Sequence, residues 1–242
     1  MPVDWFARFE ADGFTLLPAA LAEPQVEAAR AECAAALTAS AADDAVLAAG
    51  GGPSYGARNL RRLWPEVVGL LRAPGLAEPL RRILGPNAGL VRTLYFDKPP
   101  GCSWALPMHR DLTIAVRQHL PGTAFRKPTV KAGVPHVEAS RELLATMATA
   151  RVHLDAMTAE NGPLAVIPGS HRCLDGPPAD STTLHCRPGD VLLMRPLLLH
   201  ASSHSHPDCR THRRIVHFEF APSPELPDGL EWHEFLPLGE FR

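Results

Sequence analysis

Two histidines and an aspartate are the residues of this sequence whose types and spacing best suit catalysis. His109 and Asp111 are separated by one residue, and His200 follows much later. In a strand, residues two apart point to one face, so both can reach one ion while Arg110 points away. Two imidazoles and one carboxylate that leave open positions on the metal are the ligand set of non-haem Fe(II) oxygenases. Because His-x-Asp alone is a weak signal in a chain with 12 histidines, the flanking sequence must decide.

Two adjacent arginines, Arg213 and Arg214, follow His200, and either could hold an acidic co-substrate beside the metal. A guanidinium is planar and can meet a carboxylate with two parallel hydrogen bonds. Period-2 alternation places Arg213 on the same face as His217, and Arg214 on the same face as Phe218. Because a catalytic interior is the more polar face, we predict that Arg213 is the anchor, with Arg214 as its competitor.

The composition excludes several classes of protein. The chain has 242 residues, 45% of them hydrophobic, and a net charge of -2, so it can bury one large core but offers no basic field for nucleic acid. Its five cysteines are widely spaced and lack a C-x-x-C pair, which argues against a disulfide framework or a cysteine-rich zinc site. The N-terminus is charged and no run is apolar enough to span a bilayer. We expect a cytoplasmic protein without nucleic-acid or membrane partners, and the oligomeric state stays open.

The element pattern changes from helical to strand-rich along the chain. We predict helices in residues 3–38, with a break at Asp12-Gly13, and in residues 64–84. Between them, we predict a Gly-rich loop in residues 39–60. After Gly89, short β-prone runs are bounded by Gly, Pro, Asp or Asn. The pattern indicates an α+β fold with a mainly β core, in which N-terminal helices buttress a sandwich or jelly roll. We predict one domain over residues 1–242, with mainly helical support in 1–86 and the β core in 88–222.

Long motifs of the chain resemble the phytanoyl-CoA dioxygenase family of Fe(II)/2-oxoglutarate oxygenases. The matching stretches, spread over about residues 9–222, are FEADGFTLLP, KPPG…PMHRDLTI, RVHLDAMTAENGPLAVIPGSH, GDVLLMRPLLLHASS and HRRIVHFEF. The resemblance implies a double-stranded β-helix, which is a jelly-roll core. It also implies His109, Asp111 and His200 as iron ligands and Arg213 as the residue that pairs with the far carboxylate of 2-oxoglutarate. The spacing from His200 to Arg213 is about two residues longer than in the common pattern.

The resemblance predicts a 2-oxoglutarate-dependent dioxygenase that uses dioxygen to hydroxylate an unactivated carbon of a small molecule, releasing succinate and CO2. Related halogenases lack the carboxylate ligand, so the presence of Asp111 favours hydroxylation. The competing hypotheses are a cupin-like iron enzyme that does not use 2-oxoglutarate, a jelly-roll binding protein without turnover, and a zinc hydrolase. Metal content and 2-oxoglutarate binding would separate them.

Several other residues are assigned with less support from their surroundings. We predict Tyr95 and Arg151 as further co-substrate contacts, although Arg151 with His153 could equally form a buried polar network. Lys98 is interpreted as a solvated charge. We interpret the sequence PGSH at 168–171 as a structural turn. Five basic residues in segments that could border the pocket hint at an anionic substrate, although surface charge is their default role: Arg58, Arg117, Arg126, Lys127 and Lys131.

Overall fold

The helices of the protein come mostly from the N-terminal third of the chain. The computed structural model describes residues 4–48, 52–122, 124–173 and 180–241. The first helix begins after Asp4, whose side chain accepts a hydrogen bond from Phe6 N at 3.0 Å, and ends at Gly13, whose φ of 81° is left-handed. The helical segments are α1 (Trp5–Asp12), α2 (Glu23–Ala39), α3 (Leu60–Leu63), α4 (Pro74–Leu84), α5 (Arg141–Thr146) and the 3₁₀ helices η1 (Pro65–Arg72), η2 (Pro227–Gly229) and η3 (Leu238–Phe241).

The strands pair antiparallel and, in the described part of the chain, form three sheets. The largest has the order β1 (Phe14–Leu17), β12 (Val191–Met194), β9 (Ala148–His153), β14 (Ile215–Ala221), β4 (Gly89–Phe96), β3 (Ser54–Ala57) and β2 (Val46–Ala48), and β15 (Leu236–Pro237) also pairs with β4. The second has the order β11 (Thr182–Thr183), β10 (Leu164–Val166), β13 (His200–Ser202) and β5 (Leu106–His109). The third has the order β6 (Thr113–Ala115), β8 (Val134–Glu138) and β7 (Arg126–Lys131).

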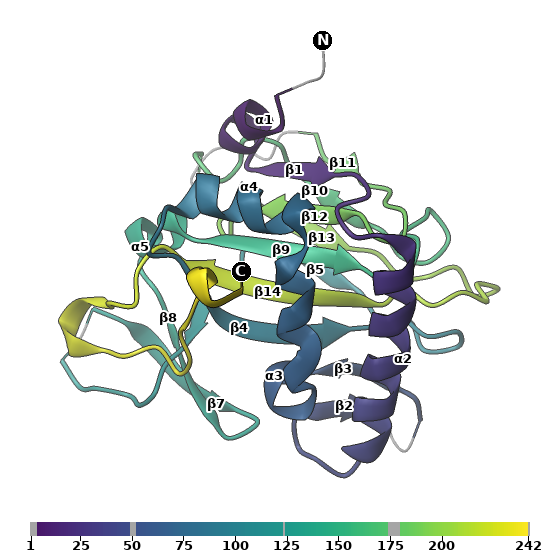
Figure 1. Ribbon diagram of the computed structural model, residues 1–242, viewed down its shortest axis with the longest axis horizontal. Coiled ribbons are helices and arrows are strands. Elements are labelled where there is room, and N and C mark those ends of the chain that lie inside the picture. The colour runs from purple at the N-terminus through teal and green to yellow at the C-terminus, as the bar shows by residue number, and fades with distance from the viewer. Residues whose placement is uncertain (1–3, 49–51, 123, 174–179, 242) are drawn as a thin grey trace.

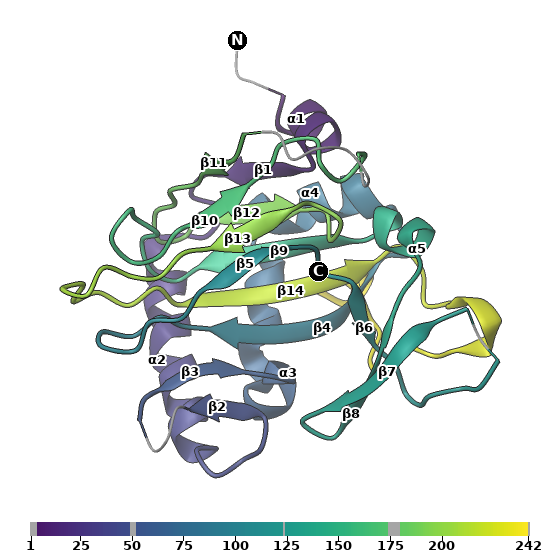
Figure 2. The same cartoon turned by 180° about the vertical axis from the view of Figure 1, so that it is seen from behind.

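The second sheet lies against one face of the largest sheet, as Figure 2 shows. Neighbouring strands are often far apart in the sequence: β12 lies between β1 and β9, and β14 lies between β9 and β4. Crossed connections between two antiparallel sheets are typical of a jelly roll. The predicted α+β fold with a mainly β jelly-roll core is therefore confirmed.

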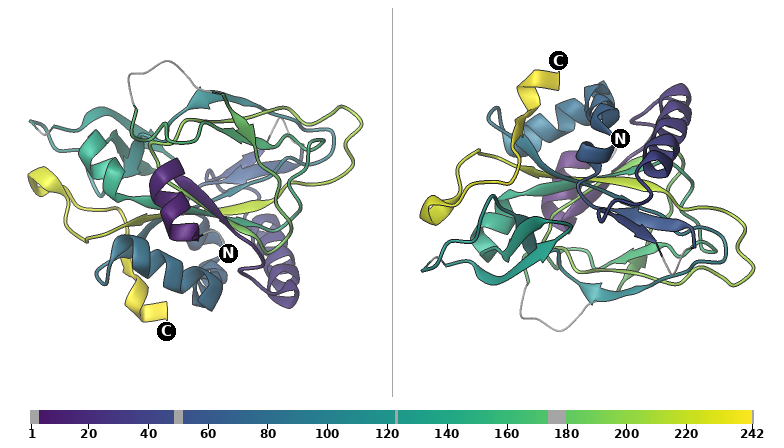
Figure 3. Two further views of the ribbon diagram at one scale, coloured as in Figure 1. Left: turned by 90° about the horizontal axis from the view of Figure 1, so that it is seen from above. Right: turned by 90° about the horizontal axis from the view of Figure 1, so that it is seen from below.

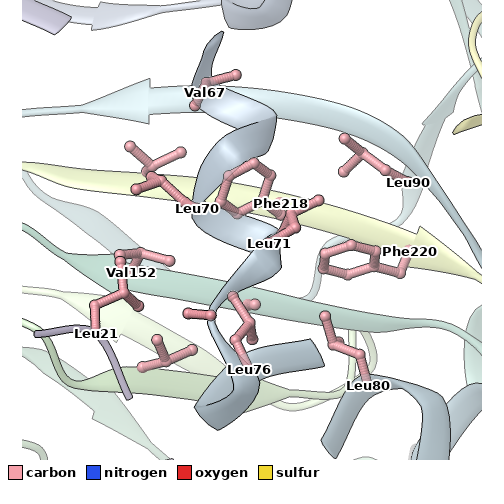
Figure 4. Packing of buried hydrophobic residues seen from close by; sticks show 14 of the residues in the cluster. Leu21, Val67, Leu70, Leu71, Leu76, Leu80, Leu90, Val152, Phe218 and Phe220 are labelled. Carbon is pink, nitrogen blue, oxygen red and sulfur yellow. The ribbon is translucent and has the colours of Figure 1, made fainter. Parts of the chain in front are cut away.

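The helices cover the other face of the largest sheet (Figures 1 and 3). Strand β14 alternates in the way the sequence predicts, because its Phe218 and Phe220 belong to the large core cluster against the helices. Figure 4 shows Leu71 and Leu76 of the helical layer packed over these phenylalanines and over Val152 of β9. The intervening His217 and Glu219 of β14 lie on the opposite face of the strand.

Two predicted segments differ from the structure. The helical stretch predicted for residues 3–38 contains β1, which pairs with β12 through Phe14 and Met194, so the break at Asp12-Gly13 turns a helix into a strand. The expected loop at 39–60 contains, in its described part, the hairpin of β2 and β3, and β3 extends the largest sheet by pairing with β4. All three strands are short and lack β-branched residues at a regular period, which is why the sequence did not predict them.

Among the described residues, no helix has the length and apolar character needed to cross a membrane.

Candidate active site

His109, Asp111 and His200 come together where strands β5 and β13 pair. The two histidines are register partners, and their ring centroids lie 4.3 Å apart. Asp111 Oδ1 is 3.8 Å from His109 Nε2, and Asp111 Oδ2 is 3.6 Å from His200 Nε2. One ligand atom from each residue lies within 4.8 Å of the others. This spacing suits three ligands on one face of a single metal ion.

Both imidazole rings are held with Nδ1 bonded to the protein backbone. Nδ1 of His109 donates to the carbonyl oxygen of Pro107 at 2.7 Å, and Nδ1 of His200 donates to that of Leu198 at 2.9 Å. A hydrogen bond of this kind fixes the tautomer in which Nε2 has a free lone pair. Both rings therefore offer Nε2 toward Asp111, where a cation would lie.

The charge states of these residues also suit a cation. Burial lowers the pKa of His200 to about 4, so its ring is neutral at neutral pH. Burial alone would raise the pKa of Asp111, but His200, His217 and His109 hold that pKa below its usual range. A neutral imidazole and an ionised carboxylate are the forms that bind a metal.

The strand that carries the first histidine is shorter than predicted. Strand β5 ends at His109, so Asp111 lies in the link between β5 and β6, where its backbone N–H bonds to the carbonyl of Pro196 at 3.0 Å. Arg110 turns away from the site and donates to the carbonyl of Leu197 at 2.9 Å. The predicted opposite orientation of Arg110 and Asp111 is therefore found without a continuous strand.

A cavity of about 400 Å³ opens beside the three residues, between the two larger sheets. Strands β4, β9 and β14 contribute one wall, and β5, β10 and β13 contribute the other. Much of the lining is apolar and consists of Leu47, Leu94, Phe96, Trp104, Leu106 and Leu164. A largely apolar cavity with a few converging polar groups is the usual form of a small-molecule site.

Two buried cations, Lys98 and Arg213, lie next to this cavity. They are 0% and 1% exposed. Ser202 lines the cavity, and its Oγ accepts hydrogen bonds from Lys98 Nζ at 2.8 Å and from Arg213 Nη1 at 3.2 Å. Both cations also lie over the ring of Trp104, at 4.7 and 5.7 Å from its centroid. Ser202 and Trp104 therefore connect the two cations to the cavity wall.

Arg213 has hydrogen-bonding capacity that the described residues do not use. Its Nη1 donates to Ser202 Oγ and to the carbonyl of Gly162, but its buried Nε and Nη2 have no partner in the described part of the chain. Burial, with nearby Arg151, lowers the pKa of Arg213 to about 9, which leaves it charged at neutral pH. A buried cation without a counter-ion is costly, so this position favours an acidic ligand.

Arg214, the competing anchor, is engaged elsewhere. Its Nε and Nη2 donate to the two carboxylate oxygens of Asp155 at 2.7 and 2.9 Å, and its backbone N–H adds a third bond to Asp155 at 3.0 Å. Arg30 also lies 3.2 Å from Asp155. This bidentate pair uses the fork of Arg214 within the protein.

The other two predicted co-substrate contacts lie on opposite faces of the sheet. Arg151 is buried and lines the cavity. Its register partner on the neighbouring strand β14 is His217. Tyr95 does not reach the cavity, because its neighbours Leu94 and Phe96 line it and strand alternation turns Tyr95 into the core cluster beneath the helices. The assignment of Tyr95 as a co-substrate contact is therefore corrected.

The environment predicted for Lys98 is wrong. It was expected to be a solvated charge, but its side chain is fully buried and bonds to oxygens of Gly162, Ser202 and Ser203. Burial, followed by the charges of Arg213 and Arg151, lowers the pKa of Lys98 to about 7.

The sequence model of the phytanoyl-CoA dioxygenase (PhyH) family matches residues 9–214 of this chain. The match covers most of the sequence and includes every residue of the metal cluster. The chain belongs to the phytanoyl-CoA dioxygenase family. It is accordingly a 2-oxoglutarate-dependent non-haem iron dioxygenase, which uses dioxygen and a small-molecule substrate.

Solved structures of similar fold support the architecture of this family member. EctD from S. alaskensis with bound Fe matches with a TM-score of 0.69 and 20% identity, over 94% of this chain and 82% of that one. The non-heme alpha ketoglutarate dependent carbocyclase SnoK from nogalamycin biosynthesis matches with a TM-score of 0.65 and 17% identity, over 95% and 89% of the two chains. No curated protein matches the sequence.

The residues of this dioxygenase fit the metal and co-substrate of its family. The His109, Asp111 and His200 cluster suits Fe(II), and the unpartnered nitrogens of Arg213 suit the carboxylate of 2-oxoglutarate. Sequence reasoning missed Ser202 and Trp104. Ser202 could have been found, because it lies two residues after His200 on β13 and shares its face. Trp104 lies in the irregular segment before β5, where residue spacing does not indicate the direction of a side chain.

Proposed function

We propose that this dioxygenase hydroxylates an unactivated carbon of a small molecule, with Fe(II) held by His109, Asp111 and His200 and 2-oxoglutarate anchored by Arg213. The observation that carries the proposal is that the three-residue cluster lines a cavity whose wall residue Ser202 bonds to Arg213. Among the described residues, Nε and Nη2 of this buried guanidinium have no partner. Iron, 2-oxoglutarate and dioxygen supply the oxidant, and 2-oxoglutarate leaves as succinate and CO2.

The protein's own part in this reaction is to hold charges and to exclude water. Arg213 and Ser202 would bind the carboxylate of 2-oxoglutarate that is far from the metal, since Arg213 has unpartnered nitrogens and the Ser202 hydroxyl lines the cavity. Lys98, which donates to the same Ser202 Oγ, would add positive charge beside them. Arg151 adds a third buried positive charge, and its side chain lines the cavity. Trp104 covers the cations and keeps water from competing for them, which strengthens each interaction.

Asp111 supports hydroxylation over halogenation. Its carboxylate lies within 3.8 Å of both histidine rings, so it would occupy the metal position that a halide needs. We also propose that residues 1–242 act as one catalytic domain, in which 1–86 support the jelly roll of 88–222. The helical layer packs its leucines onto β9 and β14, the strands that carry Arg151 and His217.

The test is the visible charge-transfer band that an Fe(II)–2-oxoglutarate chelate gives without oxygen. We expect the band in the wild-type protein, its loss in Asp111→Ala, and a requirement for far more 2-oxoglutarate in Arg213→Ala. Arg117→Ala is the control, because the Arg117 side chain is exposed and pairs with Glu231 at the surface, away from the metal cluster.

The alternatives give different results in the same experiment. A cupin-like enzyme that does not use 2-oxoglutarate would retain iron without a band, and Arg213→Ala would change nothing. A zinc hydrolase would prefer zinc and hydrolyse without forming succinate. A binding protein without turnover would show the band but produce no succinate with any substrate in the presence of oxygen. Loss of the band in Arg117→Ala as well would mean that the variants act through folding.

A further inference from the structure

We infer that the substrate carries an acidic group, a carboxylate or a phosphate, and that Arg58 and Lys131 hold this group at one end of the cavity. The inference rests on the proposed function, because it places a substrate beside the iron. It goes further by naming the chemical class of that substrate. Both side chains line the same cavity as His109 and Asp111.

The two side chains are placed side by side by their backbones. Asn59 Nδ2 donates to the carbonyl oxygen of Ala132 at 3.2 Å, which ties the segment after β3 to the turn of the β7–β8 hairpin. Arg58 and Lys131 are the chain neighbours of these two residues. Figure 2 shows the tip of this hairpin pointing toward β3 and α3. Arg58 is also fixed by its N–H, which bonds to Ala45 O at 2.8 Å.

Neither Arg58 nor Lys131 is paired with a carboxylate of the described residues. Among the described residues, the side chain of Arg58 makes no hydrogen bond or ion pair, and the side chain of Lys131 has only a 3.5 Å contact with Thr113 Oγ1. The other basic residues of the same two segments are all paired with carboxylates at 3.0 Å or less. These pairs are Arg61–Glu234, Arg62–Asp43, Arg126–Glu138 and Lys127–Glu138. Of the described basic residues in these two segments, only Arg58 and Lys131, which line the cavity, lack a carboxylate partner.

The carboxylates of the cavity have other partners. Glu219 is buried and lies 3.1 Å from Arg92, so this pair adds no net charge to the wall. Asp111 belongs to the metal cluster. This end of the cavity therefore has an excess of positive charge, and burial together with Arg92 holds the pKa values of Arg58 and Lys131 below their usual ranges. A bound anion would offset the desolvation of the two cations and reduce their repulsion with Arg92.

The proposed anion position is distinct from the one near Arg213. Lys131 and Arg92 both reach Thr113, whereas Trp104, which covers Arg213, packs against Phe96. Arg92 and Phe96 are four residues apart on β4, which is roughly 13 Å at the rise of a strand. The wall between them includes Leu94. The substrate that fits is an apolar skeleton with an acidic end, whose reactive carbon lies near His109 and Asp111.

The experiment measures anion binding directly by calorimetry. Acetate and inorganic phosphate are titrated separately, without oxygen, into protein saturated with Fe(II) and 2-oxoglutarate, so that the co-substrate position is already filled. We expect at least one of the two anions to bind with a dissociation constant on the order of 1 mM, and the better one identifies the acidic group. Arg58→Gln/Lys131→Gln should weaken this binding by at least about ten-fold.

The control variant is Arg126→Gln/Lys127→Gln, which removes the same charge from the same region but from residues that pair with Glu138 outside the cavity. It should bind the anion within about two-fold of wild type. The inference is overturned if neither anion binds tighter than about 10 mM, or if both double variants lose binding equally. The visible band is recorded on the same samples. A band without anion binding refutes only this inference, and the absence of a band refutes the proposed function instead.

Discussion

His109 on β5 and His200 on β13 are register partners, and each directs Nδ1 to a backbone carbonyl two residues earlier in the chain. The two rings are thus oriented by the strands themselves and do not depend on other side chains. Two residues far apart in sequence become a matched pair because the second sheet closes over the cavity. The second histidine is the more enclosed, at 2% exposed.

Replacing His200 should therefore remove iron binding without unfolding the protein. Loss of a residue that merely orients a ligand typically lowers metal affinity by about 10–100-fold, so loss of the ligand in His200→Ala should cost more than about 100-fold. The measurement is iron content after anaerobic dialysis. His204→Ala is the control, because His204 is exposed and its ring contacts Ser103. Equal iron retention in His200→Ala and wild type would contradict the ligand assignment.

The affinity for 2-oxoglutarate should depend on the charge of Lys98. Burial lowers the pKa of Lys98 to about 7, so the side chain is charged below that pH and loses its proton as the pH rises. Affinity should fall by about ten-fold as the pH rises from 6 to 8, a range in which Arg213 stays charged, measured by calorimetry without oxygen. Lys98→Met should bind more weakly at pH 6 and show a flatter profile. The same dependence of affinity on pH in both proteins would show that the charge of Lys98 does not contribute to 2-oxoglutarate binding.

Part of this site could be predicted from the sequence, because strand alternation involves residues that are close together in the chain. Period-2 alternation correctly placed His217 toward the cavity and Phe218 toward the helices. The three metal-site residues were implied by the resemblance to a known family, and the structure brings them together. The alternation depends only on strand geometry, whereas His200 could be joined to His109 and Asp111 only through that resemblance.

The errors concern residues whose surroundings come from distant segments. Lys98 is buried because Gly162, Ser202 and Ser203 provide its acceptors, and nothing near Lys98 in the sequence indicates these partners. Tyr95 faces the helices because β4 alternates with Leu94 and Phe96 toward the cavity, and the phase of that alternation could not be read from a strand that is buried on both faces.

Gly162 should be essential to the positions of the Lys98 and Arg213 side chains. Its carbonyl accepts bonds from Lys98 and Arg213, and its φ of 71° is left-handed. A Cβ at this position would lie 2.4 Å from Ser203 O and 2.6 Å from Lys98 Nζ. Gly162→Ala should therefore destabilise the fold by about 1–3 kcal/mol and weaken 2-oxoglutarate binding.

The matched control is Gly69→Ala in η1, where an added Cβ meets nothing within 4 Å. Denaturant unfolding and calorimetry on both variants measure the two effects. If Gly162→Ala were as stable as Gly69→Ala and bound 2-oxoglutarate normally, the close packing around this carbonyl would have no role.

His153 should make the protein sensitive to acid. It is 1% exposed, and neither ring nitrogen has a partner in the described structure. Burial, with the charges of Arg151 and Arg213, lowers its pKa to about 3, whereas an unfolded histidine titrates near about 6.5. Between these values the unfolded state binds a proton that the folded state does not. Stability therefore falls as the pH drops from about 6.5 toward 3, by up to about 1.4 kcal/mol per pH unit.

His153→Leu removes this proton from the balance while keeping an apolar side chain of similar size. The free energy of unfolding, measured with urea on the metal-free protein between about pH 4 and 6, should decline less steeply in the variant, by about one proton. Other groups titrate in this range in both proteins, so the difference between the two slopes isolates His153. Identical slopes would mean that the folded protein protonates His153 readily, and that its ring has a partner or solvent access in solution.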